Sequence, residues 1–145
     1  MRYADVTERL ADLGSEKWAI HLRGRRMRDS GIPIIELTIG EPDVPVDPRL
    51  MEIAHKAMLA GRTRYSNGRG EPGLLDALAA KYERRTGRVI TRENFVCFPG
   101  TQTALYAVMA ALSQTGDQVL VPDPFYATYE GVVRASGAEF VPVPT

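Results

Sequence analysis

Two glycine-containing stretches of the sequence could hold a phosphate group through backbone N–H donors. The first is YSNGRGEPG, residues 65–73, in which three glycines stand at the spacing G-x-G-x-x-G. This spacing is typical of loops that bind the pyrophosphate of a dinucleotide, provided that the loop follows a buried strand and opens a helix. The second is FPGTQT, residues 98–103, in which a Pro-Gly turn joins a short apolar run to a helical one.

The dinucleotide interpretation of the first stretch meets only half of its requirements. Pro72 can open a helix after the loop, but it also removes an N–H group where the phosphate would need a donor. The preceding residues, MLAGRTR, indicate the end of a helix and a polar linker instead of a buried strand. We therefore interpret residues 65–73 as a glycine-rich turn between two helices.

The second stretch predicts a better anion site. Gly100 allows a ligand to approach the backbone closely, and the N–H groups of Thr101, Gln102 and Thr103 have no acceptor inside their own helix. The helix dipole adds about half a positive charge at this end. The two threonine hydroxyls would add donors, so the turn could bind an anion without a basic residue. The alternative is that Thr101 only caps its helix.

Aromatic residues follow the next predicted strand, in VPDPFYATYEG, residues 121–131. If this strand neighbours the first, Phe125 or Tyr126 would lie beside the anion site. A flat ring next to a phosphate pocket suits a flat heteroaromatic cofactor. The alternative is packing in the core, which we favour for Phe125 and Tyr129 and less for Tyr126.

The elements that must position these residues follow from periodicity and from helix-end signals. Ser15, Asp47 and Pro48 mark helix starts, and Gly31, Gly61 and Gly87 mark helix ends. From residue 94 onward, strand, helix, strand, helix and strand alternate, which is typical of a parallel sheet covered by helices. The sequence thus predicts an α/β fold with helices over 16–30, 48–60, 74–86, 101–112 and 124–137, and strands over 34–37, 94–98, 118–122 and 138–143.

Composition restricts the class of protein. The 145 residues suffice for one domain, and 18 basic residues balance 18 acidic ones, which favours neither nucleic acid nor a membrane surface as partner. Cys97 is the only cysteine and the two histidines lie far apart, so we expect no disulfide and no metal site. No apolar run has the length of a signal-peptide core or a membrane span, and we expect a cytoplasmic protein.

The chain resembles one family, the class I/II aminotransferases, which are fold-type I pyridoxal-phosphate enzymes. The resemblance covers roughly residues 15–145, and four motifs in the family's order carry it: ELTIGEPDVPVDP, TRYSNGRGEPGLLDALAAKY, FPGTQTALYAVMAAL and GDQVLVPDPFYATYEGVVRASGAEFVPV. The resemblance implies an N-terminal helical arm with a small-domain contribution over residues 1–46. It implies that residues 47–145 are the first part of the large domain, which has a mostly parallel sheet with flanking helices.

The resemblance also implies roles for individual residues. Residues Gly100, Thr101 and Gln102 would hold the phosphate of pyridoxal 5'-phosphate, and Tyr126 would stack on its ring. Tyr65 would reach the cofactor of the other subunit in a homodimer, which makes the apparent dinucleotide motif a coincidence. The substrate's α-carboxylate would lie next to Ile39 and Gly40. The chain departs from the family at Leu75, where arginine is usual, and at Ala127, where proline is common, and we read both as neutral.

The family's Schiff-base lysine has no counterpart here, because Lys17, Lys56 and Lys81 all lie outside its S-x-S-K context. We therefore assign no catalytic residue and expect an N-terminal portion of a longer enzyme. The implied activity is transfer of an amino group between an amino acid and a 2-oxo acid. The alternatives are a C–S lyase or another fold-type I pyridoxal-phosphate enzyme, and a non-catalytic remnant that binds a phosphorylated ligand.

Overall fold

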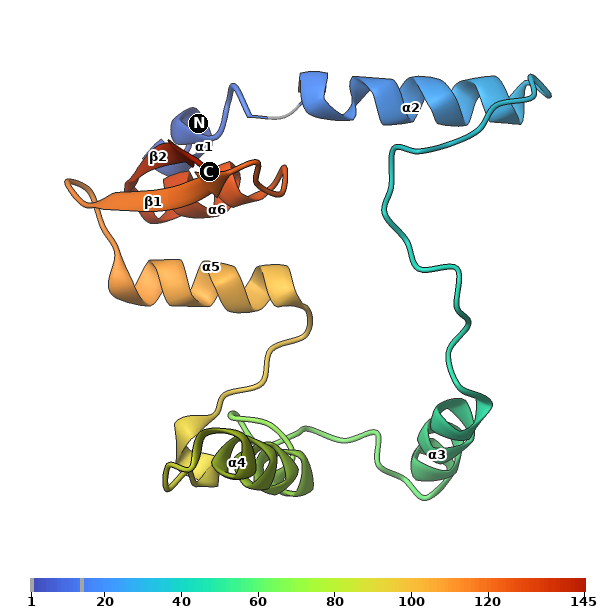
Figure 1. The fold of residues 1–145 in the computed structure, drawn as a ribbon, viewed down its shortest axis with the longest axis vertical. Coiled ribbons are helices and arrows are strands. Elements are labelled where there is room, and N and C mark those ends of the chain that lie inside the picture. Colours follow the sequence, from blue (N-terminus) through green and yellow to red (C-terminus); the bar gives the residue numbers. More distant parts are fainter. Residues whose placement is uncertain (1, 14) are drawn as a thin grey trace. The chain divides into compact units, whose positions relative to one another are not determined.

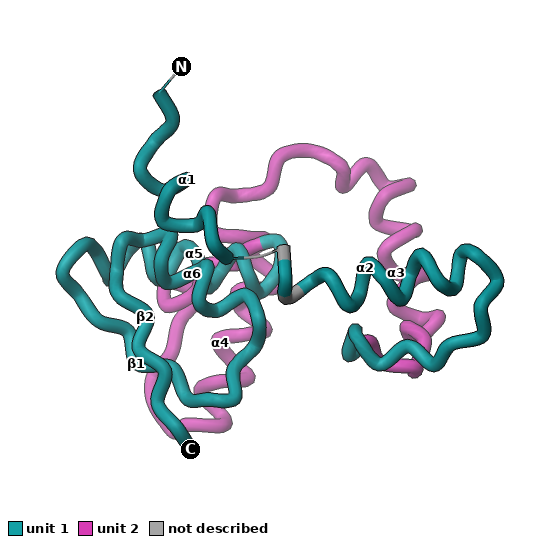
Figure 2. Tube along the Cα trace, turned by 90° about the horizontal axis from the view of Figure 1, so that it is seen from above, with its two compact units in different colours: residues 1–40, 99–145 teal, residues 41–98 magenta. Residues whose placement is uncertain are grey.

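The computed structural model describes residues 2–13 and 15–145, without the side chains of Ser15 and Lys17. The chain forms two compact units, which Figure 2 shows in teal and magenta. Unit 1 comprises residues 1–40 and 99–145, and unit 2 comprises residues 41–98. Among the described residues, no helix is both long enough and apolar enough to cross a membrane.

Unit 1 is built around a parallel pair of strands, β1 (Gln118–Asp123) and β2 (Glu139–Pro144), which are joined through helix α6 (Tyr129–Ser136; Figure 1). A parallel pair needs such a crossover, because a tight turn can only join antiparallel strands. The strands pair in register from Gln118 opposite Glu139 to Asp123 opposite Pro144. This arrangement confirms the predicted βαβ unit. Its core consists of Val121, Val133 and Ala138, packed against Met109, Val119, Phe125 and Phe140.

Helix α5 (Thr101–Leu112) precedes β1 and packs against α6. The turn that follows α6 packs closely against the turn that precedes β1. Gly137, at the end of α6, has φ = 97°, and a Cβ atom there would lie 2.8 Å from the Thr115 hydroxyl oxygen. The turn from α6 into β2 therefore requires glycine for its dihedral angle and for space.

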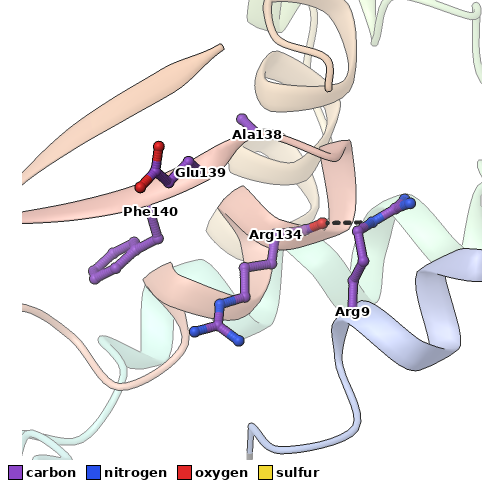
Figure 3. A pocket seen from close by; sticks show the side chains of 5 residues that line it. All are labelled: Arg9, Arg134, Ala138, Glu139 and Phe140. Carbon is purple, nitrogen blue, oxygen red and sulfur yellow. Dashed lines mark hydrogen bonds between the residues drawn. The ribbon is translucent and has the colours of Figure 1, made fainter. Parts of the chain in front are cut away.

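The N-terminal part of unit 1 contains α1 (Asp5–Arg9) and α2 (Ser15–Asp29). Arg9 donates a hydrogen bond from Nε to the Arg134 carbonyl oxygen at 3.1 Å (Figure 3). Its Nη2 donates a second one to the Ala135 carbonyl oxygen at 3.3 Å. These carbonyls belong to the last turn of α6, where helical carbonyls lack intrahelical donors and favour a cation. The sequence analysis did not predict α1. The predicted N-cap interaction of Ser15 lies outside the described side chains.

Unit 2 contains α3 (Pro48–Leu59), α4 (Pro72–Thr86) and the 3₁₀ turn η1 (Arg92–Asn94). Leu75 and Ala79 on α4 are its buried residues. The Arg92 guanidinium holds both carboxylate oxygens of Asp76, at 2.8 and 2.7 Å, and so fastens η1 to α4. This bidentate geometry fixes orientation as well as distance.

The helix ends in unit 2 agree with the sequence signals. The Asp47 carboxylate accepts a hydrogen bond from the backbone N–H of Arg49 at 2.9 Å, and Pro48 takes the first helical position. The Arg49 side chain also donates to Asp47, and these bonds hold the pKa of that carboxyl below its ordinary value. Gly87 caps α4 with φ = 68°, in the left-handed region that glycine favours.

Two predicted strands and one helix boundary are wrong. Residues 34–37 and 94–98 form no strand, since the only strands that pair in the described chain are β1 and β2. The backbone N–H of Cys97 bonds instead to the Arg69 carbonyl oxygen at 2.8 Å. Helix α6 begins at Tyr129, after a loop over residues 124–128 that the prediction placed in the helix. The expected division of the chain after residue 46 stays a prediction.

Candidate functional site

The turn at the start of α5 has the backbone conformation that an anion site needs. Gly100 is the N-cap residue, with φ = 95° and ψ = 146°, a region that side chains other than glycine rarely adopt. No atom lies within 4 Å of the position that its Cβ would take, so the turn is open on this side. No side chain caps the helix here, and the alternative role of Thr101 as N-cap is therefore wrong.

Only some of the polar groups of this turn are available to bind a ligand. The backbone N–H groups of the first helical residues have no intrahelical acceptor. Thr103 differs from the prediction, because its hydroxyl donates to the Pro99 carbonyl oxygen at 3.1 Å. Gln102 has a buried side-chain amide oxygen without a hydrogen-bond partner in the described structure. A rotation of the amide exchanges its oxygen and nitrogen, so Gln102 can present an N–H donor to an anion at the same place.

A cavity of about 650 Å³ in unit 1 brings together three of the predicted site residues, Ile39, Gly40 and Tyr126. They come from the segment that follows α2 and from the loop after β1. The other lining residues are Trp18, Ile20, His21, Thr38 and Ala127. Residues 100–102 do not line this cavity. The cavity has the size of a small-molecule site and combines aromatic walls with a few polar groups.

The aromatic residues after β1 agree with the sequence analysis only in part, because Tyr129, which we expected in the core, is 37% exposed. Phe125 packs on the core and meets Phe140 edge-on, with ring centroids 4.8 Å apart. Tyr126 is 55% exposed and touches Tyr129 at a centroid distance of 5.8 Å. Tyr126 thus keeps a ring face available to a ligand, whereas Phe125 does not.

Tyr65 and the glycine loop belong to unit 2, and Tyr65 is fully exposed there. Only Gly70 of the three glycines needs to be glycine. Its φ is 124°, and a Cβ atom would lie 3.0 Å from the Cβ of Cys97. At Gly68 and Gly73 φ lies outside the left-handed region and the space is open. The loop also follows helix α3 and a linker without an intervening strand. Gly70 therefore allows the loop to pack closely against Cys97. The structure gives no support to a dinucleotide site in this loop.

Sequence reasoning missed Trp18, His21 and Thr38 as residues that line the cavity. It considered the histidines only as possible metal ligands. The signal that could have found these residues is the run of arginines at 23, 25, 26 and 28, which leaves the predicted helix over 16–30 without a continuous apolar face. Across residues 2–13 and 15–145, no group of three or more histidine, cysteine, aspartate or glutamate side chains could hold a metal ion.

Comparison with known proteins gives one consistent family. The family model "Aminotransferase class I and II" matches residues 32–145. Arginine–pyruvate transaminase AruH of Pseudomonas aeruginosa is 40% identical over 144 residues, which are 99% of this chain and 37% of the relative. Aspartate/prephenate aminotransferase of Thermus thermophilus is 33% identical over 127 residues, which are 88% of this chain and 33% of the relative. The chain thus spans about a third of the length of these relatives.

Solved structures show the same similarity in three dimensions. Aspartate aminotransferase from Thermus thermophilus with maleate matches with a TM-score of 0.87 and 32% identity, over 100% of this chain and 38% of that one. Alanine aminotransferase from Pyrococcus furiosus matches with a TM-score of 0.87 and 28% identity, over 99% and 37%. The fold is therefore part of the α/β fold of fold-type I aminotransferases. With the family model covering most of its length, the chain belongs to the class I and II aminotransferases.

Proposed function

We propose that the full-length protein is a pyridoxal-phosphate-dependent aminotransferase and that this chain is its N-terminal portion. It would transfer an amino group between an amino acid and a 2-oxo acid. The observation that carries the proposal is the open turn at Gly100, followed by Gln102 with its unpaired amide oxygen, in a chain of the aminotransferase family. This turn offers N–H donors to a phosphate without a positively charged side chain.

The residues at this turn fit the cofactor. The backbone N–H groups of Thr101 and Gln102, with the Gln102 amide, would hold its phosphate, and the Tyr126 ring would stack on its pyridine ring. When bound, the cofactor supplies an electron sink for the charge that develops at the substrate's α-carbon. Tyr65 would contribute its hydroxyl to the phosphate of a second subunit, so we further propose a homodimer.

The substrate side of the site would be the cavity that contains Ile39, Gly40 and Tyr126. Its backbone groups at residues 39 and 40 would lie beside the substrate's α-carboxylate and orient it. The relatives named above act on arginine with pyruvate and on aspartate or prephenate, according to their names. Arginine with pyruvate is therefore the first substrate pair to assay, and aspartate is the second.

The proton-transferring lysine would come from another part of the full-length protein. Lys56 is paired with Glu52 at 2.7 Å on α3, and Lys81 is an exposed residue in α4. Neither stands in the S-x-S-K context of the family's lysine. We therefore assign neither of them to catalysis.

The test is an assay of the full-length protein with added pyridoxal 5'-phosphate. Arginine or aspartate is supplied with pyruvate, and chromatography measures alanine and the new 2-oxo acid. Alanine formation in proportion to loss of the donor supports the proposal. Pyruvate and free thiol from a sulfur amino acid, without alanine, would identify a C–S lyase instead. Cofactor binding without any turnover would identify a non-catalytic remnant.

A further inference from the structure

A hydrogen-bonded network joins α2 to the segment that carries two of the predicted substrate-binding residues. His21 Nδ1 lies 2.8 Å from the Thr38 hydroxyl oxygen and 3.1 Å from Glu36 Oε1. The Thr38 hydroxyl lies 3.2 Å from the same Glu36 oxygen, and Arg28 donates to the other carboxylate oxygen at 2.7 Å. The side chains of His21 and Glu36 are only 16% and 22% exposed.

The network requires Nδ1 of His21 to be a hydrogen-bond donor. The Glu36 carboxylate can only accept, and the Thr38 hydroxyl donates its single hydrogen to that carboxylate. The Thr38 oxygen then serves His21 as an acceptor, so Nδ1 must be the donor. His21 is thus held at Nδ1 by two oxygens, and its ring meets Trp18 edge-on at a centroid distance of 6.1 Å.

Residues 31–40 form neither helix nor strand, so the position of this segment depends on its side-chain contacts with α2. Its contacts with α2 alternate along the chain. Ile34 lies against Gly24, and Glu36 and Thr38 bond to the helix, whereas Ile35 and Leu37 are 89% and 87% exposed. Within unit 1 the segment is therefore held to α2 by its even-numbered residues. The last of these contacts, at Thr38, immediately precedes Ile39 and Gly40.

We propose that His21 is a positioning residue: it ties residues 36–38 to α2 and thereby sets where Ile39 and Gly40 stand in the cavity that Tyr126 also lines. His21 and Thr38 themselves form part of the cavity wall. The consequence for catalysis rests on the proposed function, because it requires an amino acid whose carboxylate lies beside residues 39 and 40. The positioning itself does not depend on turnover and can be measured separately.

The experiment compares three variants of the full-length protein. His21→Leu removes the donor, whereas His21→Asn places an amide nitrogen near the position of Nδ1 and can restore the bonds. His55→Leu is the matched control, since His55 is the other histidine of this chain and lies exposed on α3. Hydrogen exchange of peptides covering residues 34–40 reports on the segment. Steady-state kinetics and a cofactor titration report on the site.

We expect faster exchange at residues 36–40 in His21→Leu and a KM for the amino acid raised about fivefold to tenfold, as for the loss of one net hydrogen bond. Affinity for the cofactor and kcat should change less than twofold. His21→Asn should behave like the wild type in both measurements, and His55→Leu should change neither. Thr38→Val breaks the network from the other side and replaces His21→Leu if that variant fails to fold.

Unchanged exchange in both His21→Leu and Thr38→Val would overturn the proposal, and so would faster exchange without a change in KM. Failure of His21→Asn to restore either property would also overturn it, because the hydrogen bond would then not be the cause. If the wild type transfers no amino group, the proposed function fails. The exchange measurement then still decides whether His21 positions the segment.

Discussion

Replacing Gly100 with alanine tests the anion site through its backbone geometry alone. At φ = 95° and ψ = 146°, Gly100 occupies a region that is essentially restricted to glycine. The added methyl group would meet no atom within 4 Å. The substitution therefore introduces conformational strain without a steric clash, and it removes no hydrogen-bonding group.

The expected cost is about 1–3 kcal/mol, which is typical of a residue held in such a region. This cost can appear in the free energy of unfolding or in the free energy of cofactor binding. If the turn keeps its conformation without cofactor, the strain lowers the free energy of unfolding of the apoprotein. If the turn relaxes when empty, the strain appears on binding and weakens cofactor affinity by about 5- to 150-fold. The sum of the two changes is the quantity that the structure predicts.

The assay measures both terms on the full-length protein. Chemical denaturation gives the unfolding free energy of the apoprotein, and titration with pyridoxal 5'-phosphate gives the dissociation constant. Gly68→Ala is the matched control, because Gly68 has open space for a Cβ and a φ outside the left-handed region. It should leave both quantities unchanged. A summed change below about 0.5 kcal/mol in Gly100→Ala, well under the strain expected here, would refute the reasoning.

Three further predictions concern the fold and the cofactor. Gly137→Ala should lower the free energy of unfolding more than Gly116→Ala, although their φ values are 97° and 99°, because only the first places a Cβ 2.8 Å from a threonine oxygen. Equal losses in denaturant titrations would mean that the turn relaxes around the methyl group. The hydrogen bonds from Arg49 lower the pKa of Asp47, so the native state binds its proton less readily than the unfolded state. The resulting stabilisation is present above the ordinary pKa of 3.8 and is lost as the pH falls through the lowered pKa. Melting curves recorded from pH 6 to 3 should show this loss of stability in the wild type. The same loss should be absent from Asp47→Asn, which has no carboxyl group at this position. Tyr126→Ala should weaken cofactor binding by about 2- to 13-fold, as for the loss of a ring contact of 0.5–1.5 kcal/mol, whereas Tyr126→Phe should retain it. An unchanged dissociation constant in the alanine variant would remove Tyr126 from the stacking role.

The features that the sequence predicted well are governed by neighbouring residues. The start of α3 depends on Asp47 and Pro48, and the end of α4 depends on Gly87 in the left-handed conformation. The βαβ unit also follows from local patterns, since two short apolar runs flank a helical one. Such features need only a few residues to be correct, and their physical cause lies within one turn of helix.

The features that it missed depend on residues far away in the chain. Residues 94–98 have the composition of a strand, but a strand exists only with a hydrogen-bonded neighbour, and Cys97 bonds to the loop at Arg69. The wall of the cavity that contains Tyr126 likewise needs α2 to lie beside the loop after β1. Periodicity along one segment carries no information about either pairing. Sequence reasoning therefore indicated Tyr126 by its place after a predicted strand, indicated Ile39 only through the family resemblance, and missed His21.

The contact between Arg9 and the end of α6 has a consequence for the order of folding. The donor and its first acceptor are 125 residues apart in the chain. At a synthesis rate of about 5–20 residues per second, roughly 6–25 s separate the appearance of Arg9 from that of its carbonyl partners. During this interval α1, only five residues long, is too short to persist as an isolated helix in water. Helix α1 thus becomes stable only after α6 has been synthesised, although α1 emerges from the ribosome first.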